Sequence, residues 1–310
     1  MRNTCLNEIH RLAKDNENII FIGSDLGAGT LTNMQQELPD QFIMEGISEQ
    51  HIIGMSAGLA MEGFIPYVNS IAPFLTRRCY EQVLVDLCLH DLPVRLVGNG
   101  GGVVYAPLGP THLAVEDIAI FRVIPNMTII APCDAEEMKR LVEKTISWPH
   151  PIYIRLAKGG DKVISNSKHG FEIGKAILLR PQGQCMFITT GVMTQKAIEA
   201  SEQLEREGVH CGVLHVHTVK PLDYDALSKL IPTVRAIVTV EEHVRAGGLG
   251  SAVLEYCSDL MPEHVSKIAR IGIPDKFSDK YGSQDSLLDY WGITTGSIKN
   301  KMLDMLGNCN

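Results

Sequence analysis

FIMEGISEQHIIGMSAGLAM, residues 42–61, joins a short apolar run to a longer segment with helical character. We predict a strand over 42–44, a turn over 46–48 and a helix over 49–61. This is the repeating unit of parallel α/β sheets, which place ligand sites at the turns after their strands. Glu49 stands at that turn. A carboxylate there also has a purely structural use, because it stabilises the positive end of the helix dipole.

The same alternation of short Ile-, Val- and Phe-rich runs with helical segments continues on both sides of this unit. It predicts strands over 19–23, 64–68, 93–98, 127–132 and 151–156, and helices over 80–90 and 134–147, the last capped by Asp134. These elements form one doubly wound parallel sheet that ends near Leu156.

Residues 158–183 contain many glycines and polar residues, which predicts a linker with an entry hairpin. A second, smaller series follows, with strands over 186–191, 213–217, 236–240 and 267–272 and helices over 194–207, 249–259 and 294–306. The expected fold class is α/β, with two doubly wound domains over residues 1–165 and 166–310.

The composition excludes several classes of protein. A net charge of -8 over 310 residues argues against nucleic-acid binding, and the basic pair Arg77-Arg78 is too short to change this. The eight cysteines form no CxxC pair, and His215 and His217 alternate on a strand without a third ligand, so no metal site is predicted. No apolar run approaches the ~20 residues of a membrane span, and the amphipathic N-terminus is unlike a signal peptide. We therefore expect a cytoplasmic protein.

Two further segments could carry chemistry. The glycine-rich run at 98–102 continues to His112, and such a run after a strand lets backbone approach a ligand closely. It lacks the spacing of a Walker or GxGxxG loop. Phe74 follows a break at Pro73 and by itself is more typical of a core residue. His112 is equally typical of a histidine at the edge of a helix that begins at Ala114.

Several motifs taken together resemble the transketolase family over nearly the whole chain and in the family's order. They are GISE at 46–49, Phe74, GPTH at 109–112, IPNMTIIAPCD at 124–134, KPLD at 220–223 and VEEHVRAGGLG at 240–250. The resemblance implies the thiamine diphosphate pyrimidine-binding domain of that family, followed by its transketolase C-terminal domain.

The resemblance implies a catalytic, cofactor-binding role for Glu49. The matching glutamate of the family hydrogen-bonds a ring nitrogen of thiamine diphosphate and so activates the cofactor. Ile47, Ile52 and Ile53 flank Glu49 in the sequence, and we expect their apolar side chains to disfavour the carboxylate and keep Glu49 protonated.

Other residues match positions with known roles in the family. Phe74 matches the aromatic residue on which the pyrimidine stacks, and Asp25 matches an acid near the same ring. His112 matches a catalytic histidine that contacts the substrate oxygen, and Arg2 and Arg155 match arginines that hold the terminal phosphate of the substrate.

The sequence departs from the family at three substrate-binding positions. Leu108 stands in place of an aspartate that reads a sugar hydroxyl. Gly100 replaces a histidine and Gly29 a serine, both near the phosphate. We expect these changes to leave extra room and to shift substrate selection.

No GDG, the signature of the family's diphosphate-binding domain, occurs in the sequence. The resemblance therefore implies that magnesium and the diphosphate are bound by an N-terminal transketolase subunit, and Met1 resembles the natural start of a separate chain. Self-association is expected, with a symmetric heterotetramer as the usual arrangement. The expected substrate is a sugar or sugar phosphate.

The resemblance favours the C-terminal subunit of a two-chain transketolase, which transfers a two-carbon ketol unit from a ketose to an aldose. The alternatives are a 2-oxo-acid dehydrogenase beta subunit, a deoxyxylulose-phosphate synthase-like enzyme and a non-catalytic assembly subunit. The GPTH motif argues against the first and the split chain against the second. The third is disfavoured because Glu49, Phe74 and His112 stand where the family needs them. The sugar pair, and whether it is phosphorylated, stays open.

Overall fold

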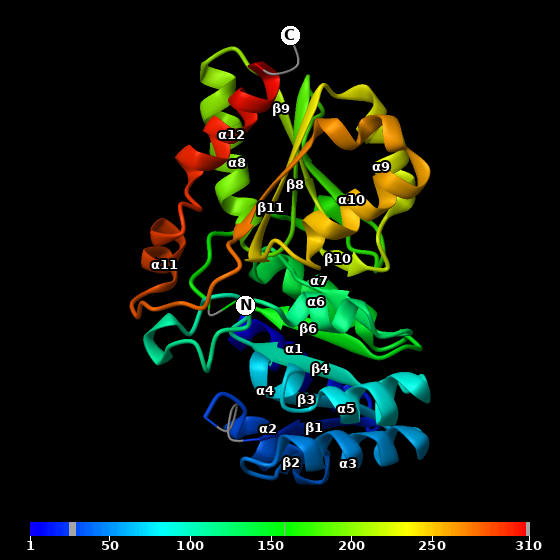
Figure 1. The fold of residues 1–310 in the computed structure, drawn as a ribbon. Coiled ribbons are helices and arrows are strands. Elements are labelled where there is room, and N and C mark those ends of the chain that lie inside the picture. The colour runs from blue at the N-terminus through cyan, green and yellow to red at the C-terminus, as the bar shows by residue number, and fades with distance from the viewer. Residues whose placement is uncertain (25–28, 158, 308–310) are drawn as a thin grey trace.

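The computed structural model describes residues 1–24, 29–157 and 159–307. Two α/β units are stacked along the long axis of the molecule, with the N-terminus between them (Figure 1). Each unit has its own sheet with helices on both faces, so the predicted fold class of two doubly wound domains is confirmed.

The first sheet has seven strands in the order β10-β5-β6-β4-β3-β1-β2. Their bounds are Ile19–Gly23 (β1), Phe42–Met44 (β2), Ile65–Ile71 (β3), Arg95–Asn99 (β4), Thr128–Ile130 (β5), Ile152–Leu156 (β6) and Thr218–Lys220 (β10). All pairings are parallel except that of β10 with β5. The sequence analysis missed β10, which joins this sheet from beyond the expected end of the first domain.

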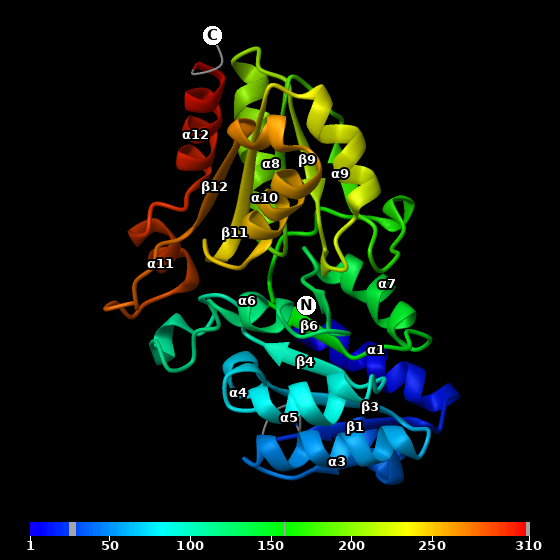
Figure 2. The ribbon, with the colours of Figure 1, turned by 45° about the vertical axis from the view of Figure 1, so that its right-hand side comes forward.

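Two helical layers enclose the first sheet (Figure 2). One layer contains α1 (Arg2–Asp15), α2 (Thr32–Glu37) and α7 (Ala135–Thr145). The other contains α3 (Glu49–Met61), α4 (Ala72–Thr76), α5 (Tyr80–Gln82) with a π-helical continuation over Val83–Leu89, and α6 (Asp117–Arg122). Apolar side chains from both layers pack on the buried strands. As predicted, Asp134 caps α7, where its side chain accepts a hydrogen bond from the Glu137 N–H (2.8 Å).

The second sheet has five strands in the order β12-β11-β8-β9-β7. Its strands are β7 (Ile177–Arg180), β8 (Cys185–Thr189), β9 (Cys211–His215), β11 (Ala236–Val244) and β12 (Ile268–Ile273). The helices are α8 (Met193–Arg206), α9 (Tyr224–Leu230), α10 (Leu249–Leu260), α11 (Gln284–Tyr290) and α12 (Thr295–Gly307). The prediction of an entry hairpin is wrong. β7 pairs antiparallel with β9 and not with β8, the next strand in the chain, because β9 lies between β7 and β8.

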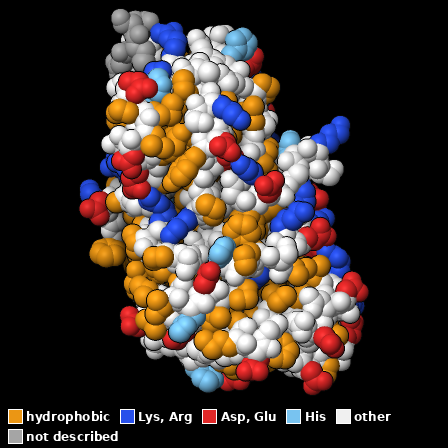
Figure 3. Space-filling view, turned by 90° about the vertical axis from the view of Figure 1, so that its right-hand side faces the viewer, with side chains coloured by type: hydrophobic (Ala, Val, Ile, Leu, Met, Phe, Trp, Pro, Cys, Tyr) orange, Lys and Arg blue, Asp and Glu red, His pale blue; other side chains and the backbone are white. Residues whose placement is uncertain are grey.

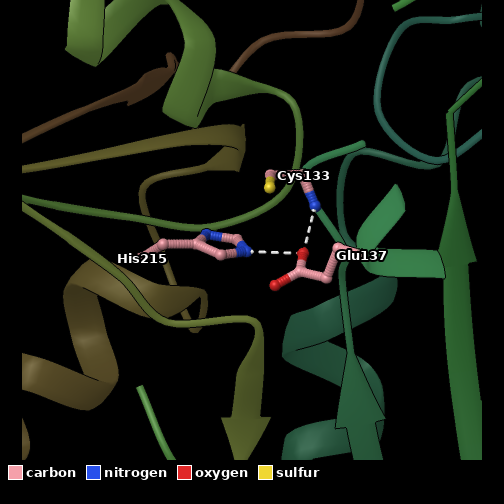
Figure 4. A group of neighbouring side chains, drawn as sticks. All are labelled: Cys133, Glu137 and His215. Carbon is pink, nitrogen blue, oxygen red and sulfur yellow. Dashed lines mark hydrogen bonds and ion pairs between the residues drawn. The ribbon is translucent and has the colours of Figure 1, made fainter. Parts of the chain in front are cut away.

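A buried polar cluster joins the two units (Figure 4). Glu137 on α7 lies 2.9 Å from His215 Nε2 at the end of β9, and its Oε2 also accepts a hydrogen bond from the Cys133 N–H. Thr194 engages the other ring nitrogen of His215 at 2.9 Å. Cys133, Glu137 and His215 are fully buried. Although the three could in principle hold a metal ion, these hydrogen bonds already account for Glu137 Oε2 and both nitrogens of His215.

The electrostatics of this cluster favour the ionised form of Glu137. Burial alone would raise the pKa of its carboxyl group, but the charge and hydrogen bond of His215 outweigh burial and lower that pKa to about 2. Sequence reasoning considered His215 only beside His217 on the same strand. The pairing of His215 with Glu137 on α7 of the first unit could not be predicted from the sequence. The cluster is therefore a buried, hydrogen-bonded contact between the units.

Removing one member of this pair should destabilise the fold. We expect Glu137→Ala or His215→Ala to lower the free energy of unfolding by roughly 3–5 kcal/mol, because each leaves a buried partner without its counter-group. The double variant Glu137→Leu/His215→Leu should lose less than the two single losses added together. Urea titration measures these values. The matched control is Glu136→Ala, whose half-exposed side chain pairs with Lys139 and should cost less than about 1 kcal/mol. Equal losses for Glu136→Ala and Glu137→Ala would contradict this assignment.

Candidate active site

The Glu49 carboxyl lies at the carboxyl-terminal edge of the first sheet. Glu49 is the first residue of α3 and is only 2% exposed. Its Oε1 accepts hydrogen bonds from Ser24 Oγ at 3.2 Å and Ser70 Oγ at 3.3 Å. Ser24 directly follows β1 and Ser70 lies near the end of the adjacent strand β3. Serine side chains at the ends of two neighbouring parallel strands therefore hold Oε1 of Glu49 in place.

The second oxygen of Glu49 binds an arginine. Arg78 Nη1 lies 2.6 Å from Oε2. Burial raises the pKa of the carboxyl, but hydrogen bonds from the Glu49 backbone N–H and from Arg78 prevail and hold that pKa below its usual value. The expectation that apolar neighbours keep Glu49 protonated is therefore wrong for the ligand-free chain. Ile47 is 71% exposed, while Ile52 and Ile53 are core residues.

Phe74 and His112 lie side by side next to this acid. Phe74 belongs to α4, and the Arg78 guanidinium carbon stands over its ring, 4.1 Å from the centroid. The His112 ring approaches Phe74 with a centroid distance of 5.3 Å and an angle of 63°. The structure thus brings Glu49, Phe74 and His112 into one continuous group, with Arg78 bridging the first two. Asp25, predicted for the same site, lies outside the described residues.

The loop that presents His112 is held at several points. Thr111 Oγ1 lies 2.9 Å from His112 Nδ1, and Arg77 donates a hydrogen bond to the Thr111 carbonyl at 2.9 Å. The helix that we expected to begin at Ala114 does not begin there. Ala114 instead exchanges two backbone hydrogen bonds with Gly102, and α6 begins only at Asp117. His112 therefore sits on a braced loop.

Arg155 does not present a free guanidinium. It is 6% exposed, and its Nε lies 2.8 Å from Asp117 Oδ2. Its Nη2 donates to the carbonyls of Ala114 and Glu242. Burial lowers the pKa of Arg155, but the nearby charges of Asp117 and Glu242 outweigh it and raise that pKa. Protein groups thus already occupy Nε and Nη2 of the guanidinium, and the contact of Arg155 with a substrate phosphate remains a prediction.

The two glycine substitutions have different surroundings. A Cβ on Gly100 would stand 2.1 Å from the Tyr105 ring, and the residue has φ +76°, so Tyr105 fills the room that we expected there. A Cβ on Gly29 would meet no atom within 4 Å. Leu108 is half-exposed on a short 3₁₀ turn, and Arg2 is partly buried at the start of α1. The substrate contacts of Gly29, Leu108 and Arg2 remain predictions.

Sequence reasoning missed three residues of this group: Ser24, Ser70 and Arg78. A signal existed for the serines, since each stands at or near the end of a predicted strand, where the strands of a parallel sheet converge on one edge. Arg78 was considered only as part of a basic pair. Its contact with Glu49 depends on how the short helix α4 directs the chain, which the sequence pattern does not specify.

The surface carries a mixture of charged and hydrophobic side chains. On the face shown in Figure 3, Lys and Arg side chains are interspersed with Asp and Glu, and hydrophobic patches lie between them. Within the described part of the chain, every helix is too short or too polar to cross a membrane.

Comparison with known proteins gives the family. The family model described as transketolase, pyrimidine binding domain matches residues 1–160, and the one described as transketolase, C-terminal domain matches residues 174–298. An apulose-4-phosphate transketolase subunit of Phocaeicola vulgatus is 35% identical, over 95% of this chain and 94% of that protein. The 6-deoxy-6-sulfo-D-fructose transketolase subunit SqwH of Clostridium sp. is 33% identical, over 96% and 92%.

Other relatives are longer than this chain or have a solved structure. The 1-deoxy-D-xylulose-5-phosphate synthase of Rippkaea orientalis is 37% identical, but the match spans only 46% of that protein. A solved structure described as a split gene transketolase, inactive beta4 tetramer, superposes with a TM-score of 0.90 at 31% identity, over 99% of this chain and 98% of that one. The chain therefore belongs to the transketolase family, as the subunit that carries the pyrimidine-binding and C-terminal domains of a thiamine diphosphate-dependent ketol transferase.

Proposed function

We propose that Glu49, Phe74 and His112 form the part of the thiamine diphosphate site that this chain contributes, and that an N-terminal transketolase subunit contributes the magnesium and diphosphate ligands. The observation that carries the proposal is a buried carboxyl group beside an aromatic ring at the carboxyl edge of a parallel sheet. The match to a split-gene transketolase structure supports the existence of a partner chain.

The described residues fit the pyrimidine half of the cofactor. An aminopyrimidine needs a hydrogen-bonding acid at its edge and an apolar face on which to stack. Glu49 Oε2 and the face of Phe74 both contact the Arg78 side chain, which is 42% exposed, so displacement of this side chain would open both to a ligand. When bound, thiamine diphosphate supplies a thiazolium carbon that attacks the ketose carbonyl.

The residues of this chain have separate tasks. Glu49 holds a proton at Oε2 for the ring nitrogen, while Ser24 and Ser70 fix the orientation of the other oxygen. Thr111 engages Nδ1 of His112, so Nε2 is the atom that we assign to the substrate oxygen. Phe74 excludes water from one face of the ring and packs against the edge of His112, so that cofactor and substrate groups stay adjacent.

Glu49→Gln should abolish turnover without loss of the fold. The amide keeps the size of the side chain but cannot supply a proton to the ring nitrogen, and general acid–base contributions are on the order of 100-fold to 10,000-fold. We expect kcat of the reconstituted two-chain enzyme to fall by at least about 100-fold. The matched control is Glu45→Gln, which makes the same change at a more exposed acid (39% side-chain exposure). A Glu49→Gln enzyme with more than about a tenth of wild-type turnover would remove Glu49 from this role.

We further propose a ketose with an anionic end other than a standard pentose phosphate as the substrate. Two full-length relatives carry names that specify such ketoses, apulose 4-phosphate and 6-deoxy-6-sulfo-D-fructose. Since Arg155 is enclosed, Arg2 is the arginine that we assign to the anion, where a guanidinium can bind a tetrahedral group through two hydrogen bonds. Leu108 cannot accept a hydrogen bond from a sugar hydroxyl, which favours a different or modified carbon chain.

A substrate panel tests this assignment. With the reconstituted complex, we expect kcat/KM for xylulose 5-phosphate to be at least about tenfold below that of the best branched or sulfonated ketose. A tenfold decrease corresponds to the loss of one hydrogen bond between the protein and the sugar. Leu108→Asp should reduce the difference in kcat/KM between xylulose 5-phosphate and that ketose. Leu89→Asp places the same charge on another exposed leucine (69%) and should leave the ratio unchanged. If xylulose 5-phosphate outruns every other ketose, the specialised-substrate proposal is wrong.

A further inference from the structure

The Arg78 guanidinium satisfies two groups at once. Its Nη1 forms an ion pair with Glu49 Oε2 at 2.6 Å, and its central carbon stands 4.1 Å above the Phe74 ring. A guanidinium is planar and carries N–H donors along its edge, so it can stack on an aromatic face and bind a carboxylate in the same position. Arg78 thus connects the acid and the ring through one flat cation.

These two contacts are the ones that an aminopyrimidine would make. A planar ring that stacks on Phe74 and hydrogen-bonds Glu49 Oε2 must occupy the space in which the guanidinium lies. The other oxygen of Glu49 is turned toward Ser24 and Ser70 inside the sheet edge, so it offers no second approach. Arg78 and the cofactor ring therefore compete for one position.

We propose that Arg78 is a built-in occupant of the pyrimidine position, which fills this position in the unloaded subunit and swings into solvent when the cofactor ring binds. The inference rests on the proposed function, because it assumes that the ring belongs to thiamine diphosphate. It adds to that function a residue that controls the loading of the site.

The surroundings of Arg78 allow this movement. Its side chain is 42% exposed, whereas that of Glu49 is 2% exposed, so the cation can leave the site without rearrangement of the core. The backbone is held in place, since the Arg78 N–H donates to the Pro73 carbonyl and Gln50 Nε2 donates to the Arg78 carbonyl. Only the side chain has to rotate, and the lost contacts are a half-exposed ion pair and one cation–π contact, both of moderate strength.

The movement also changes Glu49. While Arg78 is present, its hydrogen bond and charge help to lower the pKa of the carboxyl against the effect of burial. Departure of Arg78 removes two of the influences that lower this pKa, so the carboxyl then retains a proton more readily. The ligand-free chain thus keeps its buried acid ionised and paired, and entry of the ring removes that pairing at the position where a proton is needed.

The test measures thiamine diphosphate binding, with magnesium present, to the cofactor-free two-chain complex by calorimetry. We expect Arg78→Ala to lower Kd by about tenfold, because the ring no longer has to displace an ion pair and a stacked cation. Arg78→Lys, which keeps the charge but loses the planar stacking, should lie between wild type and alanine. The matched control is Arg11→Ala, which removes the same charge from an exposed arginine of α1 that pairs with Glu8 and Glu143, and should leave Kd within about twofold.

The outcomes separate this inference from the proposed function. The competition is supported if Arg78→Ala binds thiamine diphosphate most tightly, Arg78→Lys less tightly and the wild type least tightly. If wild type binds but Arg78→Ala binds no tighter, Arg78 is not a competitor, and the proposed function stands without it. If the wild-type complex binds no thiamine diphosphate, both the proposed function and this inference are overturned.

Discussion

The buried carboxyl of Glu49 is the constraint on which the rest of the site depends. An acid that is 2% exposed needs hydrogen bonds or a counter-charge. It receives two serine hydroxyls at one oxygen and a guanidinium at the other. The serines come from the ends of β1 and β3, so the parallel register of these strands (Gly23 beside Asn69) sets where the acid can sit. The sheet therefore fixes the position of Glu49 Oε1.

The packing of the two domains provides the second half of this support. Arg155 at the end of β6 binds Asp117 on α6 and the carbonyl of Glu242 on β11. Glu242 in turn accepts a hydrogen bond from the Val103 N–H at 2.7 Å, in the loop that leads to His112. The second domain therefore braces the loop that carries His112, while Glu137 and His215 join the domains at another point. Buried polar contacts between the domains therefore also hold the loop that carries His112.

Much of this arrangement could be predicted from the sequence, because hydrophobic periodicity and strand-end turns are local. The strands at 19–23 and 42–44 and the helix at 49–61 were predicted with the observed bounds. Contacts between distant segments could not be predicted in this way. The edge strand β10, the pairing of His215 with Glu137 and the enclosure of Arg155 each depend on how the second domain docks. Likewise, Tyr105 fills the space beside Gly100 because of a loop conformation with φ +76°, which a pattern of residues does not reveal.

We propose that this chain holds the pyrimidine half of a cofactor site that a second chain completes. Calorimetry of thiamine diphosphate with magnesium tests it most directly, on this chain alone and after addition of a GDG-containing N-terminal transketolase subunit. The described residues supply an acid and a stacking ring, whereas a diphosphate–magnesium group needs several oxygen ligands. We therefore predict weak, magnesium-independent binding to the chain alone and tight, magnesium-dependent binding to the pair. Tight, magnesium-dependent binding to the chain alone would contradict the account.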